Sequence, residues 1–523
     1  MDERKEPTMR KWWPLVAICT GACMLLVDVT IVNVALPDMA RQLHTTFSDL
    51  QWVIDLYALV LGALVLTVGA IADRFGRRRL YLIGLVLFAA ASLACGLAPN
   101  VGLLIAARGV QGVGAAAMFA TTMALISNTY SGRDRGLAFG IWGAVNGAAS
   151  AVGPIIGGLL TANFGWRWIF LVNLPVSVVA VALTLRVVTE SRDPRPRRVD
   201  VPGMVSFTVA AAALTYALIR GAWASTETIA LIAVAAAGLV AFTVIERRSA
   251  APMLDLRLLR NPTFTAMLLA GGLLSAAAWA GMTYQSLWLQ SVLGLSAIKA
   301  GLVMLPAAAA AFIVSGQVGR FLHRTSPRWM VGTGLLVIGV GALAQAVLRP
   351  GSSWPVIIPG LVLVGIGAGL AIASMSATAM SAVPWQQAGM AAGALSSFRQ
   401  LGYAFGIAVL GEVFNSGLSR GLSHGLPHGL SHGLSHGAGA GLSPALSGGQ
   451  AQAVLARTPA LAPVVHRAFA DGLDLAYVVA AGLGLIAAVT VLALVRSKPG
   501  TAAPGAAAAP AATAAAAPAG AEA

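Results

Sequence analysis

Four charged side chains stand inside long apolar runs of this chain, namely Asp28, Asp55, Arg108 and Arg399. An ionisable group in an apolar interior is costly, so it is a functional candidate wherever it occurs. Burial penalises the charged form of a carboxylate, whereas a neighbouring cation favours it. A change in either influence makes such a carboxylate take up or release a proton. These positions therefore indicate proton or ion chemistry inside an apolar body.

Asp28 and Arg108 are predicted to lie at the same depth. Asp28 is about eight residues from the end of the run 13–36, and Arg108 is about seven residues from the start of the run 101–129. At about 1.5 Å per helical residue, each lies about 11–12 Å from one shared boundary. They can therefore pair directly or through water. We expect a coupling role for the two residues; a structural ion pair is the alternative, and both readings are compatible.

The remaining candidates carry open alternatives. Asp55 lies about one turn inside its run, so it is either a second acidic site or a residue at the level of the lipid headgroups. Arg399 lies near the middle of the run 388–411, without an obvious acidic partner at that depth, and is read as a structural or gating residue or as a substrate contact. Tyr284 either faces a cavity, where it could stack on flat cations, or anchors the run at the interface.

The composition excludes a water-soluble protein. Hydrophobic residues make up 58% of the 523 residues, charged residues make up 10%, and the mean hydropathy is +0.80. Soluble domains are near 45–50% apolar and 25% charged. Nucleic-acid binding is also rejected despite the net charge of +15, because the basic residues are distributed over short loops. The three cysteines lie in apolar runs and are expected to be inert, with no metal site.

Fourteen apolar runs are long enough to be membrane spans, since a spanning helix needs about 20 residues. The predicted spans are 13–36, 51–72, 80–98, 101–129, 136–161, 168–188, 202–220, 226–245, 264–290, 298–320, 329–348, 354–380, 388–411 and 472–495. With a cytoplasmic N-terminus, 24 Lys and Arg residues fall on the inner side and 7 on the outer side. This excess fits the positive-inside rule. The fold class is therefore all-α integral membrane, with both termini cytoplasmic.

Domain boundaries follow from these runs. We predict a cytoplasmic N-terminus (1–12), a six-helix half (13–188), a linker with two extra spans (189–263), a second half (264–495) and a disordered Ala/Pro-rich tail (496–523). The second half contains a predicted outer loop, 412–471, with a Gly- and His-rich tract. Glycine and proline recur in that tract, so a spacer is favoured over a metal-binding helix.

Several short motifs accompany the spans. Residues 69–79 read GAIADRFGRRR between spans 2 and 3, and a degenerate copy, GQVGRFLHR, occupies 316–324 between spans 10 and 11. The segment 27–37 reads VDVTIVNVALP, 153–158 reads GPIIGG and 166–175 reads WRWIFLVNLP. Together these motifs resemble the fourteen-span drug:proton antiporter branch of the major facilitator superfamily, which includes methylenomycin-resistance proteins. The resemblance covers about 12–411 and 470–495.

The resemblance implies roles for these positions. It links Asp28 and Arg108 to substrate and proton coupling and offers Asp55 as a second acidic site. It also implies a cytoplasmic gate and an exporter motif in span 5. The gate residues are Gly69, Asp73, Arg74, Gly76 and Arg77, with Asp73 near the start of span 13, and the exporter residues are Gly153, Pro154, Gly157 and Gly158. The implied fold has two six-helix halves with two extra central helices.

The expected function is proton-driven export of drugs, antibiotics or related lipophilic or cationic compounds by alternating access, in a multi-pass plasma or inner membrane protein. The expected partners are a small-molecule substrate, protons and lipid, in a monomer without cofactor. Narrow natural-product export and proton-coupled uptake stay open as alternatives, and a sensor is disfavoured. No phosphate-binding loop of an ATP-driven pump and no enzyme constellation occurs in the sequence.

Overall fold

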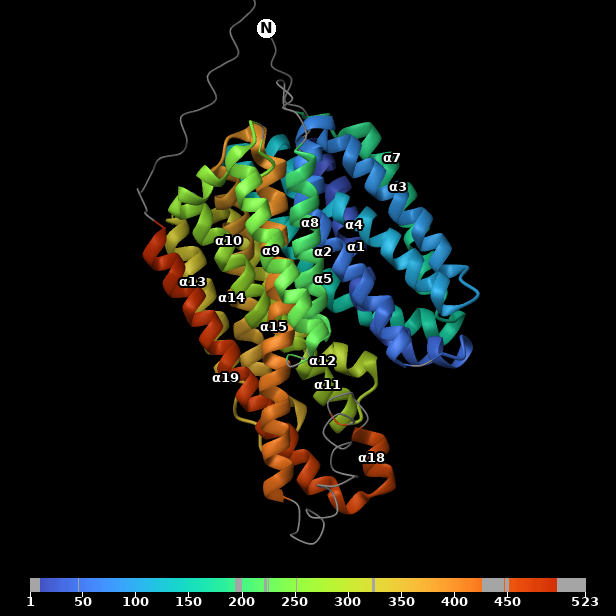
Figure 1. Cartoon of the computed structure of the whole chain (residues 1–523). Helices are drawn as coiled ribbons and strands as arrows, with labels where there is room; N and C mark the ends of the chain where they lie inside the picture. Colours follow the sequence, from blue (N-terminus) through green and yellow to red (C-terminus); the bar gives the residue numbers. More distant parts are fainter. Residues whose placement is uncertain are drawn as a thin grey trace, which may run out of the picture.

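Long helices make up the described chain, as the apolar runs predict (Figure 1). The computed structural model describes residues 10–45, 47–192, 200–220, 223, 225–250, 252–321, 325–425, 446 and 451–495. Within these ranges every regular element is a helix and no strand occurs. Helices suit a bilayer because they satisfy their backbone hydrogen bonds internally.

The first six predicted spans correspond to the helices up to residue 187. Their bounds are α1 (Trp13–Gln42), α2 (Phe47–Phe75), α3 (Arg77–Gly96), α4 (Val101–Thr129), α5 (Gly132–Phe164), α6 (Trp168–Leu171) and α7 (Asn173–Val187). The sixth span is broken at Val172, so α6 and α7 share it. The turn between α2 and α3 has a backbone φ of +111° at Gly76, a conformation that favours glycine.

The later helices follow the remaining predicted spans. They are α8 (Val201–Arg220), α9 (Thr226–Arg248), α10 (Pro262–Leu274), α11 (Ala280–Leu287), α12 (Ala297–Phe321), α13 (Pro327–Leu343), α14 (Ile358–Ser381), α15 (Ala388–Gly425), α18 (Ala451–Arg457) and α19 (Ala462–Leu494). A π-helical turn, Ser275–Trp279, joins α10 to α11, and another, Trp288–Val292, follows α11. These four helical pieces form one candidate span, Pro262–Val292, at the predicted span 264–290.

Thirteen helices in the described ranges are long and apolar enough to cross a membrane. The other apolar helix is α13, at the predicted span 329–348, and it has only 17 residues. At 1.5 Å per residue it is about 26 Å long, a little short of the ~30 Å hydrocarbon core.

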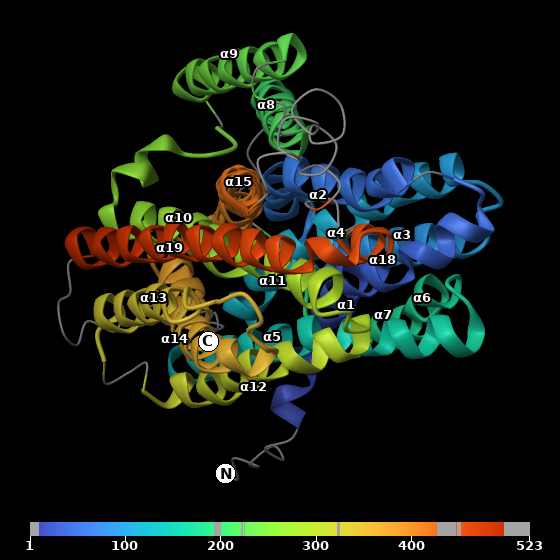
Figure 2. The same ribbon diagram turned by 90° about the horizontal axis from the view of Figure 1, so that it is seen from below.

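Helices from the two ends of the chain contact one another along the middle of the bundle. α2 packs against α15, and α5 packs against α12. α8 lies against α2 and α15, and α9 packs on α8 at the rim, so the two extra helices are peripheral (Figure 2). We call the end with the α2–α3 turn, predicted to be cytoplasmic, the inner end, and the opposite end the outer end.

The prediction of a long loop over 412–471 is wrong at both of its flanks. α15 continues to Gly425, and α19 already begins at Ala462. The two helices pack closely there: an added Cβ at Gly417 would stand 2.7 Å from the Cα of Gly472. Phe414 lies edge-on to Phe469 with ring centroids 5.4 Å apart. Tertiary packing thus stabilises helix where local composition favours coil. The Gly- and His-rich tract itself, from residue 426, lies outside the described residues.

Candidate functional site

Asp28 on α1 and Arg108 on α4 form a buried ion pair, at the common depth that their spacing predicts. Arg108 Nη1 donates to Asp28 Oδ2 over 2.6 Å. The two side chains are 0% and 1% exposed. An enclosed charge needs such a partner, because the desolvation of an isolated ion costs several kcal/mol or more.

The second oxygen of Asp28 is also occupied. Its Oδ1 accepts hydrogen bonds from Gln111 Nε2 and Asn173 Nδ2, each over 3.0 Å. Both amides also lie within hydrogen-bonding distance of Ser92 Oγ, which binds them together. Sequence reasoning missed these three residues, although polar side chains inside apolar runs were a usable signal. Both oxygens of Asp28 are therefore held by protein donors, and the side chain is closed to solvent.

Arg108 also connects α4 to α2. Its Nε donates to the backbone oxygen of Val53 over 2.9 Å, and its guanidinium lies 4.1 Å from the ring centroid of Tyr57. Nη1 donates as well to Gln111 Oε1 over 2.7 Å. One guanidinium therefore connects α1, α2 and α4.

At the inner end, Asp73 of α2 lies against the start of α15. Its Oδ1 accepts from the backbone N–H of Gly389, and its Oδ2 from that of Met390, each over 2.8 Å. A carboxylate at a helix N-terminus fills free N–H groups and is favoured by the helix dipole. Asp73 therefore holds α2 against α15 by main-chain contacts.

Arg77 completes this inner contact. Its Nη2 donates to Asp73 Oδ1 over 2.7 Å and to the backbone oxygen of Trp385 over 2.9 Å, and the residue is 0% exposed. The following turn is held by Glu190, a residue that the sequence did not single out. Its carboxylate accepts from the backbone N–H groups of Arg78 and Arg79, both over 3.1 Å. We refer to Asp73, Arg77 and the start of α15 as the inner gate, after the role that the sequence predicts.

Glycines of the motif 69–79 and of the span 5 motif 153–158 allow close helix contacts. A Cβ on Gly69 would stand 2.5 Å from the backbone oxygen of Gly389, so any side chain there would push α2 away from α15. In the span 5 motif, a Cβ on Gly153 or Gly157 would meet Thr30 or Ile31 of α1. Gly158 is buried as well, and Pro154 lies inside helix α5. Arg74 lies beside the Phe75 ring, 5.3 Å from its centroid.

Asp55, Arg399 and Tyr284 are not part of the Asp28 network. Asp55 is half-buried, and no ion pair to it is seen among the described residues. Tyr284 donates its hydroxyl to the backbone oxygen of Ile407 over 2.6 Å and lies against Phe414. That bond joins α11 to α15, so the hydroxyl of Tyr284 is engaged in packing. Arg399 lies on α15, half-buried, and is described further below.

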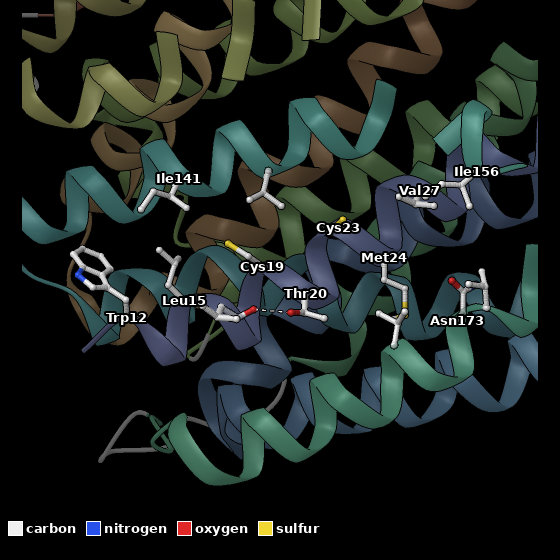
Figure 3. Close-up of a pocket in the computed structure, with 14 residues that line it drawn as sticks. Trp12, Leu15, Cys19, Thr20, Cys23, Met24, Val27, Ile141, Ile156 and Asn173 are labelled. Carbon is white, nitrogen blue, oxygen red and sulfur yellow. Dashed lines mark hydrogen bonds between the residues drawn. The ribbon is translucent and has the colours of Figure 1, made fainter. Parts of the chain in front are cut away.

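An apolar groove of about 540 Å³ runs along α1 between α5 and α7. Figure 3 shows its lining, from Trp12 at the inner end to Asn173. Cys19, Cys23 and Met24 line its floor. Asn173 is also a donor to Asp28, so this groove ends at the wall of the buried network. Its few polar groups suit an apolar occupant.

Many apolar helices with charged pairs buried between them define a multi-pass membrane transporter. A family model described as the Major Facilitator Superfamily matches residues 18–407. The chain therefore belongs to the major facilitator superfamily, and it is a transporter of the cell membrane and not an enzyme.

Known relatives agree with this family. The chain is 39% identical over 409 residues to the multidrug resistance protein Stp of Mycobacterium tuberculosis (strain CDC 1551 / Oshkosh), covering 77% of this chain and 76% of that protein. It is 30% identical to the tetracenomycin C resistance and export protein of Streptomyces glaucescens, covering 95% and 94%. The fold is similar to that of the human organic anion transporter MFSD10 (TETRAN), with a TM-score of 0.60, 16% identity and coverage of 93% and 100%.

Proposed function

We propose that this transporter exports drugs, antibiotics or related small lipophilic or cationic compounds in exchange for protons. It belongs, in this proposal, to the fourteen-span drug:proton antiporter branch, with both termini cytoplasmic and α13 as the fourteenth span. It works as a monomer, and the proton gradient drives it without a bound cofactor. Relatives named for multidrug resistance and for antibiotic resistance and export support the substrate class.

The buried Asp28–Arg108 pair is the observation that carries the proposal. The buried carboxylate of Asp28 has two states in this scheme. It is either ionised and paired with Arg108, or protonated and released from Arg108. An inward proton also gains about 2.3 kcal/mol per 100 mV when it crosses the full potential. Asp55 is a second proton acceptor in this scheme, since it lies half-buried on α2 without a described ion pair.

The inner gate supplies the conformational part of the cycle. Main-chain bonds from Asp73 to Gly389 and Met390 favour a state closed at the inner end. Substrate entry from the cytoplasm requires these bonds to break, and release to the outside occurs while they are formed. Protonation state and gate state are thus linked through α2, which carries both Asp73 and Val53, the acceptor of Arg108.

Proton release from acidified inside-out vesicles that contain the protein tests this function. A pH-sensitive dye reports the gradient while a panel of cationic, neutral and anionic compounds is added. We expect at least one compound to dissipate the gradient with the wild type and none to do so with Asp28→Asn. Asp134→Asn is the matched control, because Asp134 forms only an exposed ion pair with Lys11.

Narrow export of a single natural product is the second candidate. It is favoured by the relative from Streptomyces glaucescens, which matches nearly the whole chain and is named for one compound. In the vesicle assay it predicts that one scaffold is active while the remainder of the panel is silent. Proton-coupled uptake instead predicts that an imposed gradient moves the same compound in the direction of the protons.

A further inference from the structure

Arg399 is a membrane-embedded cation without a partner in the described structure. Its Nε and Nη1 are shielded from solvent, and neither makes a hydrogen bond. No carboxylate among the described residues lies within ion-pair distance of it. Buried ionisable groups normally pair within the protein, and a buried donor on a charged group is costly to leave without an acceptor. The guanidinium therefore points to an acceptor that comes from outside the chain.

The position of Arg399 is interior. A Cβ added to Gly271 of α10 would stand 3.2 Å from Arg399 Cγ and 3.6 Å from Met375 Cε of α14. Arg399 thus lies where α10, α14 and α15 meet. Glycine at 271 leaves room for the stem of the arginine, and Met375 is 0% exposed. The adjacent face of α15, with Gly389 and Gly393, packs on α2.

Neighbouring groups on the same face of α15 are hydroxyls. Ser396 precedes Arg399 by three residues and Tyr403 follows it by four, a spacing that places all three on one side of the helix. Ser396 is 0% exposed, and its Oγ has no hydrogen-bond partner in the described structure. The hydroxyl of Tyr403 lies 3.4 Å from Thr283 Oγ1 of α11. This face offers several donors and no carboxylate of its own.

The charge nearest to this face comes from the other end of the chain. Asp55 of α2 is close enough to Tyr403 for an electrostatic interaction, yet it forms no ion pair with Arg399. The Asp28 carboxylate is already paired with Arg108, so it adds no free acceptor. Arg399 and Asp55 thus remain a cation and a carboxylate that are not paired with each other in the described structure.

We propose that Arg399, together with Ser396 and Tyr403, binds the anionic group of the transported compound. The proposal rests on the export function and specifies its substrate class: an aromatic or lipophilic molecule that carries a carboxylate, or an ionised phenol or enol. A planar guanidinium offers two parallel N–H groups to such a group. The apolar surroundings of Met375 and Leu395 accommodate the hydrocarbon part. Asp55 stays free to carry the proton.

Equilibrium binding of naphthoate and of its neutral isostere naphthamide tests the site. The purified full-length protein is dialysed against each compound in neutral maltoside micelles, with empty micelles subtracted. We expect naphthoate to bind more tightly than naphthamide, and Arg399→Gln to weaken naphthoate binding by about 10- to 100-fold, as for the loss of charge-assisted hydrogen bonds. Arg399→Lys should retain part of the affinity, and Ser396→Ala should weaken it less than Arg399→Gln.

Controls separate this site from charge in general and from proton coupling. Arg220→Gln, at the exposed end of α8, should leave naphthoate binding unchanged. The organic-anion site is refuted if naphthoate binds no better than naphthamide, or if Arg399→Gln binds naphthoate normally. It is also refuted if sodium chloride, at a concentration equal to that of naphthoate, displaces naphthoate fully. Dialysis uses no proton gradient, so it tests this site independently of proton coupling. If the vesicle assay showed transport of cations alone, this site would be refuted while proton-coupled export would stand.

Discussion

At the residue scale, Asp28 shows how a charge is kept inside an apolar bundle. Three donors from two helices, α4 and α7, hold its two oxygens, and Arg108 is the only charged donor among them. Removing one partner of such a buried pair leaves an uncompensated ion, whereas removing both charges does not. The stability of the pair and its role in coupling can therefore be separated by mutation.

Arg108→Gln should lower the free energy of unfolding by about 3–5 kcal/mol, because the Asp28 carboxylate then stays buried without a cation. The double variant Asp28→Asn, Arg108→Gln should recover most of this loss yet show no proton coupling. Unfolding in micelles followed by tryptophan fluorescence measures the first effect, and vesicle proton release measures the second. Lys11→Gln, in an exposed ion pair with Asp134, should cost less than about 1 kcal/mol.

An equally unstable double variant would contradict this account of the pair. It would mean that the loss arises from packing around Arg108, such as its contact with the Tyr57 ring, and not from an unpaired charge.

The depth of the charged residues could be predicted from the sequence, whereas their direction around the helix could not. Counting from the ends of two spans placed Asp28 and Arg108 together. The count said nothing of Gln111 or Asn173, because contacts depend on how each helix is rotated against its neighbours. For the same reason the sequence could not decide whether Tyr284 faces a cavity or anchors its helix at the membrane interface. In the structure its hydroxyl donates to the backbone oxygen of Ile407.

At the element scale, the inner gate is a contact between one side chain and the end of one helix. Asp73→Asn should weaken the closed state, because an amide can accept through only one of its two ends while Asp73 accepts through both oxygens. We expect slower transport with nearly unchanged substrate binding. Transport rate in vesicles and equilibrium binding in micelles measure the two quantities, and Arg79→Gln, 70% exposed, is the control.

Loss of binding by Asp73→Asn with a normal transport rate would contradict the gate assignment. It would place Asp73 in contact with substrate instead.

We call the helical segments 412–425 of α15 and 462–471 of α19 the outer extension. Two glycines of α19 form a matched pair for testing how this extension packs. A Cβ on Gly472 would stand 2.9 Å from Phe414, whereas a Cβ on Gly482 would meet nothing within 4 Å. Gly472→Ala should therefore lower stability by about 1–3 kcal/mol, the usual cost of overpacking. Gly482→Ala should be neutral or stabilising, since alanine favours helix. The free energy of unfolding of each variant in micelles measures the difference. Equal effects of the two substitutions would show that α15 and α19 are not closely packed at Gly472.

The outer extension was missed because its helices depend on each other. Residues 412–425 are rich in glycine and serine, and the segment 462–471 is interrupted by Pro463, Arg467 and Asp471, so neither is a continuous apolar run. Each becomes helical when it buries its small residues against the other. Elements that are apolar throughout, such as α14, were predictable from composition alone.

At the scale of the whole molecule, the fourteen-span topology depends on α13, which at 17 residues is shorter than each of the thirteen longer candidate spans. Reporter fusions ending at Ser326 and Gly351, on either side of α13, should differ: a fluorescent protein should be bright after Ser326, and alkaline phosphatase should be active after Gly351. Fusions at Thr458 and after Leu494 should be outer and inner respectively. The same result on both sides of α13 would exclude fourteen spans.

Long apolar helices follow from solvent physics, so the sequence predicts the all-helical membrane fold well. The packing of α2 on α15 and of α5 on α12 was not predictable from apolar runs, because those contacts join residues hundreds of positions apart. The peripheral position of α8 and α9 likewise depends on tertiary packing, although their existence as extra spans was clear.

Helix α15 has 38 residues, so it is about 57 Å long at 1.5 Å per residue, roughly twice the hydrocarbon thickness. One end accepts the inner gate, its middle carries Arg399, and its far end packs on α19 beyond the predicted membrane surface. A rod of this kind tilts as a unit. An antibody fragment that clamps the outer tip of α15 would then immobilise the gate on the opposite face of the membrane. It would inhibit transport from outside the cell without competing with any substrate.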